Sequence, residues 1–469
     1  MRIATLSRLS RALQSGKCFL TAALVLTFAI LSSAPSADAL PAFARKYGLR
    51  CSACHESWPM LNYFGQKFKD NGYQLMNDHD APIWQNASYW PITLRITPFW
   101  SRESTNKVAI DTAPTGEQRM TTTGFNLSGL DILTGGTLEN NISFLLVPSS
   151  DETGAFHFES ANVRFDNLFH SPWLNVKVGK FELDSFISEK RTLTLSASGG
   201  GYQLFHFIPV GDGNIFGQIG DNQLGVEWMG HSLNDRTRLS AAVFNSTDGN
   251  VDLPYGQNSY TTFLAGSQAF DTGKLGVQRV GGYLMYGVAP TTYLTQGGVP
   301  LPGSGTGNKS FTRVGFEGLF YVGRHLDFQV FTQHGSDDAW FGACFGEIIT
   351  GTCDPANNNA GGVVLPAGFR NPTWNGAFVE THYVVHPQLT IFQRSEWVRM
   401  SQQADPTVAK NLGDIDNYVF GYRYNPFMTS RAGFAFHNEY SWIRQRGTSP
   451  TTGSDLTSNS LLLGFDFDF

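Results

Sequence analysis

The chain has 469 residues, of which 33 are basic and 39 acidic, so its formal net charge is −6. A mildly acidic chain excludes the broad basic surface that a nucleic-acid partner requires. Glycine, phenylalanine and tyrosine are abundant, with 50, 37 and 16 copies, and beyond the first 39 residues no segment approaches the roughly 20 continuous apolar residues of a membrane-spanning helix. This balance favours a β-protein whose strands alternate between an apolar and a polar face.

The N-terminus has the pattern of an export signal. Four basic residues precede an apolar run at 18–31, which is too short to span a bilayer comfortably. The sequence SADAL at 36–40 then offers a small-x-small cleavage site that ends at Ala39. We therefore expect residues 1–39 to be a signal peptide of a bacterial exported protein, with retention as an uncleaved anchor as the alternative.

The next element carries the clearest chemical motif. Residues 50–57 read RCSACHES and contain Cys-x-x-Cys-His. Two thiols at this spacing add to the vinyl groups of haem, and the adjacent histidine becomes an axial ligand of the iron. The sequence predicts one covalent haem c, with Cys51 and Cys54 as its thioether links and His55 as the axial ligand. A zinc pair or a disulfide is the alternative.

The haem motif lies in a short α-helical segment, residues 40–89. A chain of this size struggles to form a stable core alone, although covalent haem helps. We therefore expect the segment to be sheltered by the rest of the chain, as a plug in a barrel lumen or at its periplasmic mouth. Met76 and His79 are candidates for the second axial ligand of the iron, and plain packing is the alternative role for both.

Residues 90–469 have the pattern of an outer-membrane β-barrel. In the final segment, NSLLLGFDFDF, the aromatic residues share one face and Asp466 and Asp468 share the other. Segments of about ten alternating residues recur upstream, which is typical of strands that cross a bilayer with a lipid side and a lumen side. We predict an all-β, antiparallel transmembrane barrel of about sixteen strands. The expected strands are 91–103, 122–134, 138–148, 155–166, 173–182, 221–230, 236–245, 258–269, 275–288, 311–322, 325–335, 375–385, 388–400, 415–425, 428–443 and 457–469.

The connections between these strands alternate in length. Tight connections such as 322–325 and 385–388 alternate with long polar stretches such as 182–220 and 336–373. Short periplasmic turns and long outer loops are the usual asymmetry of such barrels. Within the longest loop we expect a disulfide between Cys344 and Cys353, because an exported protein reaches an oxidising compartment; a metal pair is the alternative.

Charged residues stand on the predicted lumen faces of consecutive strands. One interpretation is a selectivity filter or charge path, and the other is a set of compensating pairs in a wet lumen. The residues are Glu380, His382, Arg394, Glu396, Arg423, Arg431, His437 and Glu439.

The motif segment resembles the fused monohaem cytochrome–porins of bacterial outer membranes. The matching positions are Phe43-Ala44-Arg45, Gly48, Cys51 to His55, Pro59, Leu61, Phe64-Gly65, Phe68-Lys69 and Gly72-Tyr73. The match covers about 35 residues, and the rest agrees only in architecture and length. Lys46-Tyr47 and Asp70 depart from the pattern of the Fe(II)-oxidising branch, so the resemblance points to the wider family.

The resemblance implies an electron-transfer role at the outer membrane. Electrons would pass from an extracellular donor such as Fe(II) through the haem to a periplasmic carrier such as a cytochrome or a cupredoxin-like protein. Two other functions stay open: a porin for small solutes with a structural haem plug, and electron export to an extracellular acceptor. Whether an Fe(II) oxidase activity accompanies electron transfer also stays open.

Overall fold

The computed structural model describes most of the chain after the predicted signal peptide. Its described residues are 41–57, 59–75, 80–85, 91–109, 117–150, 154–194, 203–207, 219–220, 222–246, 260–290, 295–296, 299–300, 308–338, 370–402, 414–428, 433–447 and 454–468. Residues 1–39 lie outside these ranges. No helix within the described ranges is long and apolar enough to span a membrane.

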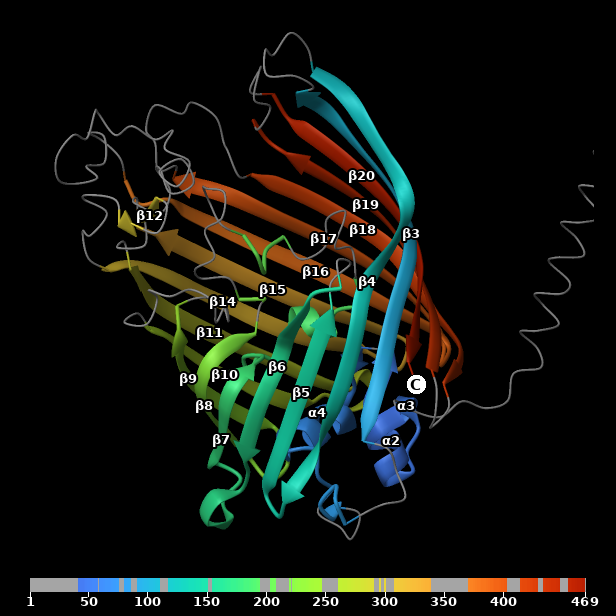
Figure 1. Cartoon of the computed structure of the whole chain (residues 1–469), viewed down its shortest axis with the longest axis vertical. Coiled ribbons are helices and arrows are strands. Elements are labelled where there is room, and N and C mark those ends of the chain that lie inside the picture. Colours follow the sequence, from blue (N-terminus) through green and yellow to red (C-terminus); the bar gives the residue numbers. More distant parts are fainter. Residues whose placement is uncertain are drawn as a thin grey trace, which may run out of the picture.

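Sixteen antiparallel strands close into one barrel, as predicted (Figure 1). Each strand pairs with its neighbours in the barrel, and β20 closes the ring by pairing with β3. The strands are β3 (Ile92–Ala109), β4 (Glu117–Glu139), β5 (Ile142–Ser150), β6 (Phe156–Phe165), β7 (Asn175–Phe181), β8 (Gln223–His231), β9 (Thr237–Asn245), β10 (Tyr260–Asp271), β11 (Val277–Pro290), β14 (Asn308–Val322), β15 (Leu326–Asp337), β16 (Thr373–His386), β17 (Leu389–Gln402), β18 (Ile415–Met428), β19 (Gly433–Gln445) and β20 (Leu456–Asp468). A separate two-residue pair, β12 (Thr295–Gln296) and β13 (Val299–Pro300), lies between β11 and β14.

The largest departures from the predicted boundaries are in the first hairpin. The ladder of β3 and β4 continues to the pair Ala109 and Glu117, well beyond the predicted limits at 103 and 122. The extra residues are mostly polar, so the apolar alternation stops although the pairing of the two strands continues. A pattern of side chains cannot detect a ladder that extends past the apolar band.

The predicted alternation of faces is confirmed on strands such as β18 and β20. On β18, Tyr418 and Phe420 are exposed on the outside, whereas Arg423 is buried in the lumen. On β20, Leu463 and Phe465 are exposed and Asp466 is buried. An apolar exterior around a polar interior is the arrangement that a bilayer requires of a spanning barrel.

Short turns gather at one end of the barrel, which we call the short-turn end. They include 140–141, 232–236, 323–325 and 387–388. The start of β3 and the end of β20 lie at the same end, as expected for an even number of strands. Figure 1 shows the helices of the N-terminal segment at this end, near the C-terminus.

The connection after β7 corrects one expectation. Residues 182–220 were expected as a long outer loop, but the described parts, 182–194 and 203–207, fold into the lumen. We call them the lumen segment. Leu204 and Phe205 are buried against the inner wall, where the ring of Phe205 lies 4.9 Å from that of Phe331 and 5.5 Å from that of Phe378.

Two buried carboxylates accept hydrogen bonds from backbone amides of the lumen segment. Glu380 accepts a hydrogen bond from the amide of Leu193 at 2.9 Å. Glu396 accepts one from the amide of Leu204 at 2.7 Å. Arg394 lies between the two carboxylates, at 3.2 Å from Glu380 and 3.4 Å from Glu396. Three of the predicted lumen charges, Glu380, Arg394 and Glu396, are therefore paired, and the two carboxylates also position a loop, whereas Arg431 lies outside the described residues.

The N-terminal segment comprises residues 41–57 and 59–75. It contains α2 (Pro41–Tyr47), α3 (Cys51–Cys54), the paired strands β1 (His55–Ser57) and β2 (Met60–Leu61), and α4 (Tyr63–Asp70). Its core is a set of stacked or edge-on rings from α2, α4 and the residue that follows Gly72, namely Phe43, Tyr47, Phe68 and Tyr73.

Hydrogen bonds join α2 to the inner wall at the short-turn end. Lys46 donates to Thr137 of β4 at 2.7 Å, and the amide of Ala42 donates to Thr93 of β3 at 3.1 Å. Both strands present these hydroxyls at the short-turn end. The N-terminal segment therefore contacts the inner wall of the barrel at the short-turn end.

Candidate functional site

The Cys-x-x-Cys-His motif occupies one short helix and the residue after it. α3 spans Cys51 to Cys54, and His55 begins β1. Cys54 and His55 both line a cavity of about 230 Å³. The side chain of Cys51 lies outside the described residues.

Apolar residues from both parts of the chain form the cavity walls. Phe43 and Phe68 contribute from the N-terminal segment, and Leu133 of β4 and Leu145 of β5 contribute from the barrel. The charged side chains among the described lining residues are all cationic. They are Arg50, Lys69, Lys190 and Arg191. Such a cavity suits a largely apolar ligand that carries negative charge.

The ring of His55 is positioned by the residues that follow the motif. Its Nδ1 atom lies 3.2 Å from the carbonyl oxygen of Pro59, and a neutral ring that donates its Nδ1 proton carries its lone pair on Nε2, the nitrogen that a metal would then bind. Burial lowers the pKa of His55 to about 4, against smaller opposing contributions from backbone hydrogen bonds at Pro59 and Met60. The imidazole is therefore neutral at pH 7, as a metal ligand must be.

Asn62 fastens the motif helix to α4. Its backbone N–H donates to the carbonyl of Cys54 at 2.9 Å, and its side-chain nitrogen, Nδ2, donates to the carbonyl of Ala53 at 3.0 Å. Its side-chain oxygen accepts from the amide of Gly65 at 2.9 Å, which caps the start of α4. Asn62 thus forms hydrogen bonds both with the last residues of α3 and with the first turn of α4.

Gly65 allows α3 and α4 to approach this closely. A Cβ atom at this position would lie 2.0 Å from the carbonyl oxygen of Cys54. Because the obstacle is backbone, no rotamer change relieves it. The glycine of the Phe64-Gly65 pair therefore has a physical reason, which is the close packing of α4 on the motif helix.

A buried cation without a hydrogen-bond acceptor among the described residues also bears on whether the cavity fits an acidic ligand. Lys69 of α4 lines the cavity, and its Nζ atom makes no hydrogen bond among the described residues. The nearest carboxylates are Asp184 at 3.6 Å and Glu182 at 4.0 Å. Burial lowers the pKa of Lys69 to about 8. The cationic lining, the apolar walls and the oriented His55 fit a covalently attached haem with its acidic side chains.

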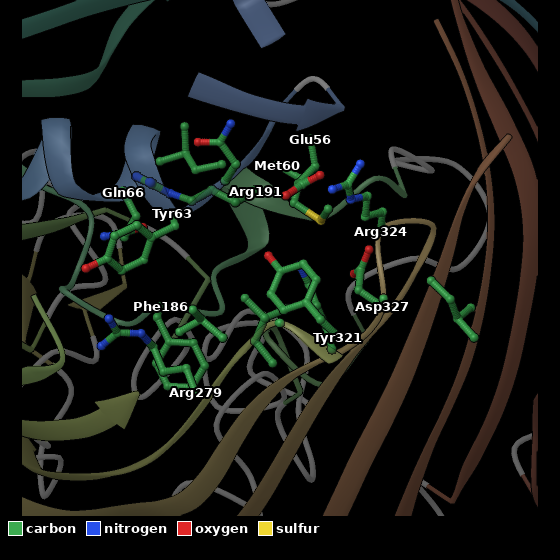
Figure 2. A pocket seen from close by; sticks show the side chains of 18 residues that line it. Glu56, Met60, Tyr63, Gln66, Phe186, Arg191, Arg279, Tyr321, Arg324 and Asp327 are labelled. Carbon is green, nitrogen blue, oxygen red and sulfur yellow. The ribbon is translucent and has the colours of Figure 1, made fainter. Parts of the chain in front are cut away.

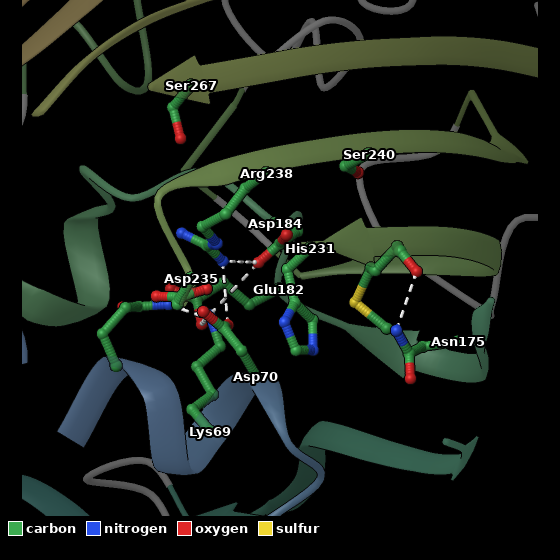
Figure 3. Close-up of polar contacts among 12 residues, drawn as sticks. Lys69, Asp70, Asn175, Glu182, Asp184, His231, Asp235, Arg238, Ser240 and Ser267 are labelled. Carbon is green, nitrogen blue, oxygen red and sulfur yellow. Dashed lines mark hydrogen bonds and ion pairs between the residues drawn. The ribbon is translucent and has the colours of Figure 1, made fainter. Parts of the chain in front are cut away.

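The end of α4 is fixed to the barrel by a buried ionic network (Figure 3). Arg238 of β9 donates to Asp70 at 2.9 Å and to Asp184 at 2.6 Å. Arg164 of β6 donates to the carbonyls of Lys69, at 2.8 Å, and of Asp70. These contacts bring together the N-terminal segment, the lumen segment and two strands.

Asp235, in the turn between β8 and β9, makes this docking sensitive to pH. Burial and then the adjacent Asp70 raise the pKa of Asp235 to about 7. The folded state then holds a proton that the unfolded state releases near pH 4, so this stabilisation is complete below about pH 4 and is lost as the pH rises through 7. We expect amide hydrogen exchange of residues 63–70, corrected for intrinsic pH effects, to be faster at pH 8 than at pH 5.

Asp235→Asn is expected to remove this pH dependence and to slow exchange in α4 at pH 8. Asp271→Asn, which alters an exposed carboxylate at the end of β10, serves as the control. Equal pH dependence in the wild-type chain and Asp235→Asn would refute the assignment.

A second cavity, of about 400 Å³, lies beside the first at the short-turn end (Figure 2). Figure 2 shows Glu56 and Met60 of the N-terminal segment facing Tyr321 and Asp327 of the barrel. Arg191 lines both cavities and therefore stands between them.

Several predicted site residues cannot be placed. Met76, His79, Cys344 and Cys353 lie outside the described residues, so the second axial ligand and the disulfide stay predictions. Sequence reasoning missed Asn62, Lys190 and Arg191. No local signal marks the last two, because they follow the haem motif by more than 130 residues and read as part of a polar loop.

No protein-family model matches the chain, and no curated protein matches it. The barrel is similar to solved outer-membrane proteins. A loop L8 deletion mutant of OmpT from Vibrio cholerae is 13% identical, with a TM-score of 0.46 over 81% of this chain and 100% of that chain. The channel DcaP of Acinetobacter baumannii is 11% identical, with a TM-score of 0.44 over 80% and 97%. OprB of Pseudomonas putida is 10% identical, with a TM-score of 0.43 over 80% and 94%. At this level of similarity no property of those proteins extends to this chain.

Proposed function

We propose that this chain is an outer-membrane electron-transfer protein of the fused monohaem cytochrome–porin type. One covalent haem c would accept an electron from an extracellular donor, Fe(II) in the first instance, and pass it to a periplasmic cytochrome or cupredoxin-like carrier. The observation that carries the proposal is the composition of the cavity lined by Cys54 and His55. Its walls are apolar, and every charged side chain among its described lining residues is a cation. When bound, the haem supplies one-electron redox chemistry.

The position of the cavity supports a role at the membrane boundary. Barrels of this kind carry their short turns on the periplasmic side, so the N-terminal segment would face the periplasm. Exposed aromatic side chains of α4, Tyr63 and Phe64, lie beside the haem-attachment helix and would give a soluble carrier a short approach to the cofactor. His55 orients the iron, and the thioethers from Cys51 and Cys54 prevent loss of the haem.

A solute porin is the second candidate, and the strand number favours it. Barrels of 16 to 18 strands leave an aqueous channel when nothing fills them. Against it stands the lumen segment, whose described residues pack rings and aliphatic side chains against the inner wall. Electron export to an extracellular acceptor would use the same haem in the opposite direction.

Electron passage across vesicles tests the proposal. Full-length protein is placed in lipid vesicles that contain ferricyanide, and Fe(II) is added outside. We expect haem reduction followed by bleaching of the trapped ferricyanide, at a rate proportional to haem content. Cys54→Ser, which removes one thioether, is the matched variant and is expected to lose most of this rate. An equal rate in the two proteins would mean that Fe(II) leaks through the barrel, in favour of the porin.

A further inference from the structure

We propose that Lys190 and Arg191 of the lumen segment, together with Lys69 of α4, bind the two carboxylates of the haem. The cofactor would then join the N-terminal segment to the lumen segment. This inference rests on the proposed function, because it assigns partners to the acidic side chains of the same haem.

The charge of the cavity is the first argument. A haem is an apolar plane with two carboxylates on one edge. The described lining residues are mostly apolar and contain no carboxylate, whereas Lys69, Lys190 and Arg191 all reach the cavity. Ammonium and guanidinium groups form short, charge-assisted hydrogen bonds with carboxylates. A dianionic apolar ligand therefore complements this lining better than a neutral or cationic one.

The state of Lys69 is the second argument. Its side chain is one-tenth exposed, yet Nζ forms only long ion pairs, at 3.6 and 4.0 Å, and makes no hydrogen bond among the described residues. A buried ammonium without hydrogen bonds costs free energy unless a ligand satisfies it. A haem carboxylate in the adjacent cavity would supply the missing acceptor.

Neighbouring carboxylates fix Lys190 and Arg191 in place. The 3-10 turn Glu189–Arg191 carries both residues, and the Ser188 hydroxyl accepts a hydrogen bond from the amide of Lys190. Glu182 engages Nε and Nη2 of Arg191, and Glu159 pairs with Lys190 at 2.9 Å. Arginine has five N–H donors, so the Glu182 contact leaves donors of Arg191 for a second carboxylate.

The midpoint reduction potential of the haem reports whether these cations lie close to it. A cation near the haem stabilises the reduced form, which holds one more electron. We expect Arg191→Gln and Lys190→Gln to lower the midpoint potential, each by about a tenfold change in the reduction equilibrium constant, or about 59 mV for one electron. Arg191→Lys keeps the charge and is expected to restore most of the wild-type potential. Arg324→Gln, an exposed residue of the second cavity only, is the matched control and should leave the potential unchanged.

A spectroscopic signature separates carboxylate binding from a general electrostatic effect. The bending vibration of the haem carboxylates in resonance Raman spectra responds to their hydrogen bonds, and we expect it to shift in Arg191→Gln but not in Arg324→Gln. Pigmented variants whose potential and vibration match the wild-type protein would overturn this inference alone. A wild-type chain without pigment would instead overturn the proposed function.

Discussion

Replacing Gly65 with alanine is expected to reduce covalent haem incorporation to less than about a tenth of the wild-type level. The added Cβ would lie 2.0 Å from the carbonyl oxygen and 3.0 Å from the Cα of Cys54. Backbone atoms on both sides must then separate, and forced overpacking of this kind typically costs about 1–3 kcal/mol, occasionally more. The separation would break the hydrogen bond from Asn62 to Cys54 and move a thiol away from its vinyl partner.

The measurement is haem absorbance per mole of protein after extraction from the outer-membrane fraction. Gly124→Ala is the matched control, because a Cβ at that position on β4 would meet no atom within 4 Å. We expect Gly124→Ala to assemble with the haem content of the wild-type protein, which would show that a glycine-to-alanine change alone does not reduce it. Full pigment in Gly65→Ala would show that close packing of α3 on α4 is unnecessary.

The double replacement Glu380→Gln, Glu396→Gln is expected to turn a nearly non-conducting barrel into an ion channel. The two carboxylates accept hydrogen bonds from Leu193 and Thr194, and from Gln203 and Leu204, respectively. They also neutralise Arg394, whose guanidinium carbon lies 3.7 Å from the ring centroid of Phe378. Losing both charges leaves a buried cation uncompensated, which is strongly destabilising, and weakens the anchors of the lumen segment.

Single-molecule conductance in planar bilayers checks this prediction. The wild-type chain should carry little steady current, whereas the double variant should open to conductances of the size that an unobstructed sixteen-strand barrel gives. Asp337→Asn alters another buried lumen carboxylate, paired with Arg313 at 2.7 Å, and should stay closed. Large steady currents through the wild-type protein would contradict the account of a packed lumen.

Much of the barrel was predictable because a strand that crosses lipid places apolar side chains on its outer face and can place polar side chains on its inner face. Residues such as Phe420 and Arg423 reveal their faces through alternation alone, without knowledge of any partner. The strand number and closure followed from the same rule. The ends of β3 and β4 did not, because a polar ladder outside the apolar band looks like a loop.

The lumen segment could not be predicted for a different reason. Its residues 189–194, EKRTLT, read as a polar loop, and their placement inside the barrel depends on contacts with Glu380 and Glu159, which lie elsewhere in the sequence. The haem motif itself was visible because its chemistry is local. The cations that face it come from another part of the chain, and only the closed barrel brings them together.

The central claim is that a lipid-embedded barrel of this chain carries one haem on Cys51, Cys54 and His55. Intact mass and visible absorbance of the mature protein, purified from outer membranes and then denatured, test it most directly. The account predicts a mass increased by one haem and a c-type spectrum that persists after denaturation and disappears in Cys51→Ser, Cys54→Ser. A mature barrel of unmodified mass and no visible colour, expressed where haem attachment is active, would contradict it.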